Sequence, residues 1–120
     1  MTDAEIARFL CREVLGWKWH LKPKQYRFHD QDGGWRHKDS GRPIQTATPD
    51  FLTWDGFGLL LTALAKPERS PGLDYEADIP NQWTAYVYGD NHEFPMVAID
   101  PDPKRALMRA TARAYNMEGL

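Results

Sequence analysis

The sequence predicts a single α+β domain over residues 1–120, in which three helices pack on a small antiparallel sheet. Three observations predict this class. The length is close to that of one domain. Apolar residues repeat at helical spacing in three segments, at both ends and in the middle of the chain. The two segments between them are rich in aromatic and β-branched residues and contain turn residues, as antiparallel strands do.

The first helix is predicted over residues 3–15. Thr2 and Glu5 have the spacing of a capping box, and Gly16 follows the last apolar position. The apolar residues recur every three or four positions and form one face, which comprises Ile6, Phe9, Leu10 and Val14. The segment therefore predicts an amphipathic helix that packs on the rest of the domain.

Residues 17–44 predict a basic aromatic β-ribbon, which we call the basic arm. Trp17 and Trp19 alternate with polar residues, as side chains do on one face of a strand. A turn signature over residues 30–34, which includes the Gly33-Gly34 pair, is expected to separate two short strands. Seven lysines and arginines against three aspartates give the arm a charge of +4.

A second helix is predicted to begin after Thr53 as N-cap and to end before Pro67. Trp54 lies one turn before the apolar face of this helix and is assigned to the core. That face comprises Phe57, Leu60, Leu61 and Leu64. The next segment, residues 67–82, holds three prolines and four acidic groups and is predicted to form an acidic loop.

Residues 83–88 and 96–99 predict an antiparallel hairpin, because turn residues separate two segments of aromatic and β-branched residues. The last helix is predicted to begin with Asp102 as N-cap and Pro103 as its first residue, and to extend to about Met117. Alanines recur at every fourth position, which lets the helix lie close on a sheet, and they are Ala106, Ala110 and Ala114.

Residues with catalytic or metal-binding chemistry form no motif of known spacing, so we expect no enzyme, no metal site and no cofactor. His20, His29 and His37 lie in the basic arm, but they lack the spacing of zinc ligands. The aspartates near helix starts are in positions that the helix dipole favours without any chemistry. The single cysteine, Cys11, has no histidine near it in the sequence to activate it as a nucleophile.

The overall composition indicates a cytoplasmic protein. One cysteine excludes an intramolecular disulfide framework and fits a reducing compartment. The sequence contains neither the pattern of a secretory signal nor an apolar stretch of membrane-spanning length. With 15 basic and 17 acidic residues the net charge is −2, unlike the strongly basic balance of many nucleic-acid binders.

The candidate binding residues are aromatic and cationic side chains, which interfaces favour. In the basic arm these two kinds of residue interleave, as in proteins that hold single-stranded nucleic acid by charge and stacking. The pattern also fits contact with a protein or a small anionic ligand, or a solvated strand face whose aromatic residues point into the core. In the hairpin, an inward Trp83 would leave the tyrosines on the opposite face. The candidates are Trp19, Trp35, Arg36, Lys38, Tyr86 and Tyr88.

Several short motifs are shared with a known family. They are Val14-Leu15-Gly16-Trp17 after the first helix, Pro49-Asp50-Phe51 before the second, the Trp83 strand, and Ala112-Arg113-Ala114-Tyr115 near the end. In these motifs the chain resembles the small phage and prophage proteins grouped as the phage ABA sandwich domain. The resemblance covers nearly the whole chain. It implies an α+β sandwich and a phage or prophage origin, but no activity and no functional residues. The glycines after Trp54 and the long acidic loop depart from the family pattern.

Small size, patches of opposite charge and surplus aromatic residues favour a non-enzymatic binding module. The leading hypothesis is a phage-type protein that engages, and inhibits or sequesters, a host component such as a defence complex or its nucleotide signal. The alternative is an RNA or single-stranded DNA binding protein, which would use the basic arm together with Lys104, Arg105, Arg109 and Arg113. Self-association is also expected, because residues 68–93 carry six acids and one base and could meet the basic arm of a second copy.

Overall fold

The structure is a computed structural model that describes residues 2–21, 33–67, 69–76, 81–89 and 93–117. The helices are α1 (Asp3–Glu13), α2 (Trp54–Leu64) and α3 (Pro103–Ala114). The first sheet consists of β1 (Trp17–Leu21), β2 (Gly33–His37) and β3 (Pro43–Gln45). The second consists of β4 (Gly72–Glu76), β5 (Gln82–Val87) and β6 (Met96–Asp100). The predicted α+β class is confirmed, but in the described ranges the strands form two antiparallel sheets instead of one.

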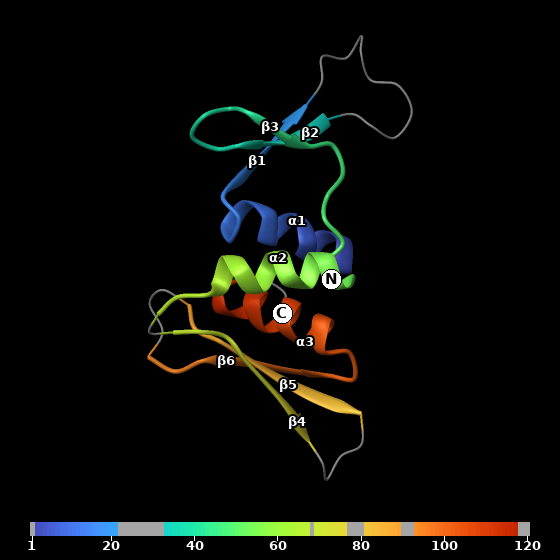
Figure 1. Ribbon diagram of the computed structural model, residues 1–120, viewed down its shortest axis with the longest axis vertical. Helices are drawn as coiled ribbons and strands as arrows, with labels where there is room; N and C mark the ends of the chain where they lie inside the picture. Colours follow the sequence, from blue (N-terminus) through green and yellow to red (C-terminus); the bar gives the residue numbers. More distant parts are fainter. Residues whose placement is uncertain (1, 22–32, 68, 77–80, 90–92, 118–120) are drawn as a thin grey trace.

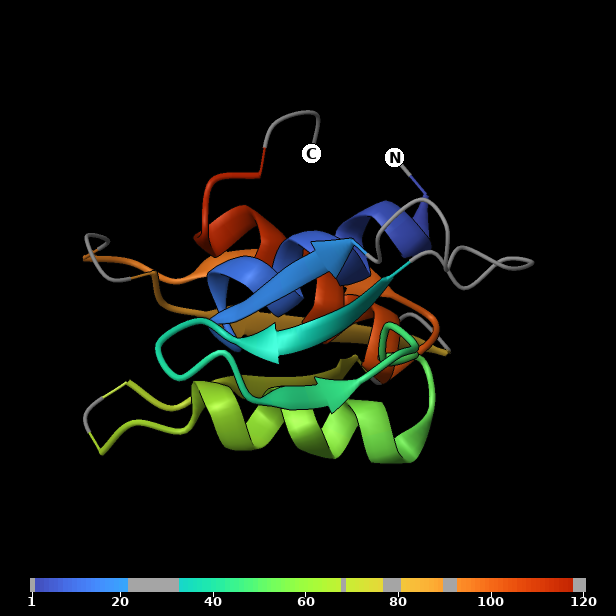
Figure 2. The same cartoon turned by 90° about the horizontal axis from the view of Figure 1, so that it is seen from above.

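The molecule has three layers, with the helices between the two sheets (Figure 1). Its extents are 56 × 29 × 26 Å, and the long axis runs from one sheet to the other. Seen from above, the first sheet lies across the helical layer, with α2 along one side (Figure 2). The two outer sheet faces therefore point away from each other, at opposite ends of the molecule.

Helix α1 begins as the sequence predicts, because Thr2 Oγ1 accepts a hydrogen bond from the backbone N–H of Glu5 at 3.1 Å. Ile6 and Leu10 are fully buried on its apolar face. The helix ends at Glu13, two residues earlier than expected, and Gly16 follows with a φ of 69°. That left-handed conformation favours glycine and turns the chain into β1.

The strands of the basic arm pair antiparallel, with Trp19 opposite Trp35. The prediction that Gly33 and Gly34 form a turn is wrong, because both belong to β2. A Cβ on Gly33 would lie 2.6 Å from the carbonyl oxygen of His20 and 2.7 Å from the Trp19 ring. The absence of a side chain there lets the indole lie directly against the β2 backbone. The rest of the expected turn, residues 30–32, lies outside the described residues, as do Tyr26 and Phe28.

Helix α2 confirms Thr53 as its N-cap, because Thr53 Oγ1 accepts from the N–H of Gly56 at 3.1 Å. Gly56 is buried against the backbone of Asp50 and Phe51, where a Cβ would clash. The assignment of Trp54 to the core is wrong, since this side chain is 67% exposed at the first position of the helix. The helical period put Trp54 near the apolar face, but its exposed ring lies beside Phe57 in the next turn and the ammonium group of Lys104.

The predicted acidic loop at residues 67–82 contains strand β4, so the loop prediction is wrong over residues 72–76. Pro67 and Pro71 precede the strand, where they break no ladder hydrogen bond. Leu73 pairs with Ala85 and Tyr75 with Trp83, which places these four side chains on one face. The excess of acidic and turn residues in this segment hid, at the level of the sequence, the alternation of Leu73 and Tyr75 with polar residues and glycine.

The predicted hairpin is confirmed as β5 and β6, with Ala85 opposite Ala98. Both alanines are buried on the face toward α3. The predicted start of α3 is also confirmed, because the Asp102 side chain accepts from the N–H of Lys104 at 2.9 Å. The alanines of the predicted stripe are all buried, namely Ala106, Ala110 and Ala114. Small side chains on both partners let this helix and this sheet approach closely.

Candidate functional site

The six candidate residues do not form one site. Trp19, Trp35, Arg36 and Lys38 belong to the first sheet or the turn that follows β2, whereas Tyr86 and Tyr88 belong to the second sheet or the residues just after β5. These two groups lie at opposite ends of the molecule, with the helices between them (Figure 1). Each end therefore has to be considered as a separate surface.

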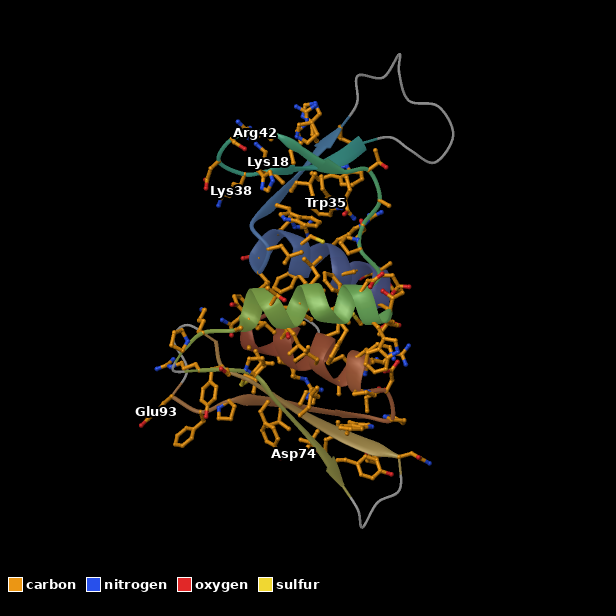
Figure 3. The ribbon with its side chains drawn as sticks, viewed as in Figure 1. Lys18, Trp35, Lys38, Arg42, Asp74 and Glu93 are labelled. Carbon is orange, nitrogen blue, oxygen red and sulfur yellow. The ribbon has the colours of Figure 1, made fainter. Side chains whose placement is uncertain are left out.

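Trp35 is a core residue and not part of an accessible surface, because its side chain is 1% exposed. Trp17 and Trp19 lie beside it, with ring centroids 6.2 and 5.1 Å away. Its Nε1–H donates to Thr48 Oγ1 at 3.0 Å, which satisfies the one polar group of the buried ring. The three tryptophans of the basic arm thus point toward the helices, as Figure 3 shows for Trp35.

The cations of the first sheet lie on its other face. Lys18 is directly opposite Arg36 in the pairing of β1 with β2. Strand side chains alternate, so residues that interleave with the tryptophans along the chain are separated from them in space. Figure 3 shows the cations Lys18, Lys38 and Arg42 together at this end. We call Lys18, Arg36, Lys38 and Arg42 the cationic surface.

A short turn positions the last two members of the cationic surface. The carbonyl of Arg42 accepts from the N–H of His37 at 2.9 Å, and the carbonyl of His37 accepts from Gly41 at 2.9 Å. Gly41 has a φ of 71°, which favours glycine. Ser40 Oγ accepts from the N–H of Arg42 at 3.3 Å. These bonds close the connection between β2 and β3 and hold Lys38 and Arg42 at one end of the sheet.

The four cations have no acidic partner in the part of the chain that the structure describes. Like charges directly opposite each other on adjacent strands are destabilising. The Lys18–Arg36 pair is therefore a local cost to the fold. Such a conflict between local preference and fold is typical of a functional surface.

The opposite end of the molecule is acidic. The strands of the second sheet contain Asp74, Glu76 and Asp100 and no lysine or arginine. Asp74 and Glu93 lie at this end, far from the cationic surface (Figure 3). The guanidinium carbon of Arg69 lies 6.0 Å from the centroid of the Tyr88 ring. Tyr86 is on the outer face of β5. Sequence reasoning found both tyrosines but assigned them to the same function as the basic arm.

The sequence analysis missed Val97 and Ile99, which lie on the outer face of β6 and are 37% and 58% exposed. Met96 and Ala98 alternate with them and face α3. Strand alternation was the signal that could have found them, because two inward apolar residues leave the intervening ones outward. The outer face of the second sheet is thus partly apolar as well as acidic.

Three of the four cations of α3 are engaged within the molecule, whereas the buried Nε of Arg109 has no hydrogen-bond partner among the described residues. Lys104 Nζ lies 3.0 Å from Asp102 Oδ1 and 4.2 Å from the centroid of the Trp54 ring. Burial alone would raise the pKa of Asp102, but its hydrogen bonds from Lys104 and the charge of that residue outweigh burial and lower it. Arg105 Nη2 lies 3.0 Å from Asp3 Oδ2. Arg113 Nη1 donates a hydrogen bond to the carbonyl oxygen of Val97 at 2.6 Å. The latter bond covers part of the free edge of β6.

The structure places Cys11 in the core of the molecule. Cys11 is fully buried, and burial raises the pKa of its thiol to about 12, so the reactive thiolate is absent at neutral pH. Within the described ranges, no group of three or more histidine, cysteine, aspartate or glutamate side chains could hold a metal ion. His29 lies outside those ranges.

The described residues around α1 and the first sheet line several cavities. One of about 260 Å³ lies between α1 and the inner face of the sheet and is lined by Arg8, Arg12, Trp19, Leu21 and Trp35. A second, of about 190 Å³, borders β2 and β3 and includes Arg36 and His20. A third, of about 280 Å³, lies between α1, the residues before α2, and α3.

None of the helices in the described ranges has both the length and the apolar character needed to cross a bilayer. No family model, curated protein or solved structure matches this chain.

Proposed function

We propose that the protein is a non-enzymatic binding module that engages an acidic surface of a partner protein through its cationic surface. The Lys18–Arg36 cross-strand pair carries the proposal. Two opposed cations reduce the stability of the isolated sheet, and an anionic partner would convert this repulsion into attraction. The turn that holds Lys38 and Arg42 in place also supports a binding role for the cationic surface, since a preorganised surface loses less entropy on binding.

The biological setting belongs to the proposal. The protein acts in the host cytoplasm as a phage-type inhibitor that blocks or sequesters a host protein or complex. The short motifs shared with the phage ABA sandwich domain support this setting, together with the small size of the chain. Acidic protein surfaces are the expected target, because complementary charge accelerates association and rejects partners of like charge.

A nucleic acid is the competing partner, because the same cations could bind phosphates. The geometry favours a protein over single-stranded nucleic acid. Trp17, Trp19 and Trp35 lie on the inner face of the first sheet, so they offer no stacking platform beside the cationic surface. A second copy of the chain is also an acidic partner. Its acidic end and cationic surface point in opposite directions, so such a contact would be head-to-tail.

The test is affinity capture from a lysate of cells that contain the protein, with the bound material identified by mass spectrometry. The wild type is compared with the double variant Lys18→Glu/Arg36→Glu. Lys66→Glu, in the residues after α2, is the matched control because it reverses one charge outside the first sheet. Each capture is repeated at about 50 and about 200 mM salt, with and without nuclease. Sedimentation velocity of the purified chain at both salt concentrations measures self-association.

We expect a partner with an acidic surface to be retained by the wild type and by Lys66→Glu and to be lost from the double variant. Retention of the same partner by a folded double variant would contradict the proposal. Recovery of nuclease-sensitive material with a steep loss at higher salt would replace it with the nucleic-acid function. A dimer or larger assembly that dissociates in the double variant would identify a second copy as the partner.

A further inference from the structure

The cavity of about 260 Å³ between α1 and the first sheet is chemically distinct from the cationic surface. It lies on the inner side of the sheet, because Trp19 and Leu21 belong to the strand face that packs toward α1. Its lining combines Arg8 and Arg12 of α1 with Trp19 and Leu21 of β1, and it borders the buried Trp35. Polar and apolar groups line it in similar proportion, and small-molecule sites use such polar groups to fix the orientation of the ligand.

The charged side of the cavity is formed by Arg8 and Arg12, which lie one turn apart on α1. Like charges at this spacing on a helix repel each other. Both side chains are exposed, and neither forms an ion pair with any residue in the described part of the chain. Guanidinium groups bind phosphate and carboxylate oxygens through paired hydrogen bonds. The two arginines therefore offer a site for one anionic group.

The opposite side of the cavity is an aromatic wall that the sheet holds in place. Trp19 is half-buried and lies directly against Gly33, where no side chain separates the ring from the backbone. Its ring meets that of Trp35 edge-on, with ring centroids 5.1 Å apart and an interplanar angle of 75°. Leu21, which is 52% exposed, extends the apolar wall toward solvent. A flat ring can pack on such a wall without moving it.

We infer that this cavity binds a nucleoside monophosphate, with the phosphate between Arg8 and Arg12 and the base against Trp19. The pairing of an anion site with a rigid aromatic wall favours a ligand that has both a charged and a flat part. The cavity is slightly smaller than those that enclose drug-sized ligands, so it fits a mononucleotide better than a larger nucleotide. The site is independent of the proposed protein partner, because it shares no residue with the cationic surface.

Isothermal titration calorimetry on the full chain tests the inference with three probes: adenosine monophosphate, adenosine and inorganic phosphate. We expect the monophosphate to bind at least about tenfold more tightly than either part alone. Arg8→Gln and Arg12→Gln should each weaken it about tenfold, as expected for loss of one charged hydrogen-bonding group. Trp19→Leu should reduce the affinity for the monophosphate to that for phosphate. Arg42→Gln is the matched control, because it removes one arginine outside the cavity.

Three results would overturn the inference. The first is no heat of binding for the monophosphate with a folded wild type. The second is equal weakening by Arg42→Gln and Arg8→Gln, which would indicate binding by general charge. The third is an unchanged affinity in Trp19→Leu, which would remove the aromatic contact. Circular dichroism of each variant confirms that it is folded. Lysate capture by Arg8→Gln should match the wild type, so failure here is distinguishable from failure of the proposed protein partnership.

Discussion

The two sheets have the same three-stranded antiparallel order, but their inner faces pack on the helices in different ways. The first sheet presents indole rings to α1, with Trp35 fully buried at the centre. The second presents Ala85 and Ala98 to the alanine stripe of α3. Small side chains bring backbones close together, whereas large rings of fixed shape hold them apart. Two of the cavities described above border Trp35.

The outer faces of the two sheets differ in charge. The first carries cations whose mutual repulsion is not relieved within the described residues. The second belongs to an acidic segment, and an α3 arginine caps the edge of its last strand. In the described residues, the second sheet thus packs on α3 through small side chains, whereas the first packs through large rings and carries cations without an acidic partner. The following predictions test this difference, beginning with the largest effect.

Replacing Trp35 by alanine should have the largest effect. It removes a fully buried indole and its hydrogen bond to Thr48, so we expect a loss of about 3 to 5 kcal/mol in the free energy of unfolding. Urea denaturation followed by circular dichroism measures this loss. Trp35→Phe keeps an aromatic ring and should cost less. A loss below about 1 kcal/mol for the alanine variant would show that the tryptophan cluster does not hold the first sheet on α1.

Replacing an alanine of the α3 stripe by a larger residue should lower the stability, because α3 and the second sheet pack closely. Ala110→Leu adds three carbon atoms where α3 meets the sheet, and overpacking of this kind costs about 1 to 3 kcal/mol. Ala4→Leu, at an exposed position of α1, is the control and should change stability by less than about 0.5 kcal/mol. Thermal unfolding of both variants provides the measurement. Equal stability of Ala110→Leu and the wild type would mean that this interface has spare room.

The start of α3 should respond to pH. Asp102→Ala removes the N-cap, and we expect a loss of about 1 kcal/mol at neutral pH. The pKa of Asp102 is lowered in the folded state, so the stability from its charge is present above the unfolded pKa of about 3.9. It is lost as the pH falls through the lower, folded pKa. The difference between wild type and variant should therefore shrink in acid. A difference that does not change with pH would exclude this contribution.

The sequence was most informative where local chemistry alone decides the structure. The caps at Thr2, Thr53 and Asp102 were predictable, because each side chain bonds a backbone N–H two or three residues ahead. The hairpin of β5 and β6 was predictable for the same reason, because inward and outward side chains alternate along each strand. Strand β4 was concealed because its acidic and turn-forming residues outnumber its two alternating apolar ones. The role of Gly33 depends on the Trp19 ring of another strand, which no local pattern reveals.

The candidate site was only partly predictable. Arg36 and Lys38 were expected at a contact surface and lie on the exposed side of the sheet or in its turn. Trp35 was expected beside them but is buried, because the faces alternate and the sheet had to bury one of them. Arg8 and Arg12 carried no signal, since two arginines on a polar helix face are ordinary until a neighbouring strand places Trp19 opposite them.

Reversing one charge in the Lys18–Arg36 pair tests the central claim most directly, although its effect on stability is the smallest. Lys18→Glu places opposite charges across β1 and β2, so the free energy of unfolding should rise by about 0.2 to 1 kcal/mol. The same variant should lose the partner that the wild type retains in lysate capture, whereas Lys66→Glu should keep it. A more stable protein that no longer binds is the predicted result. A variant that is no more stable and still retains the partner would contradict the account.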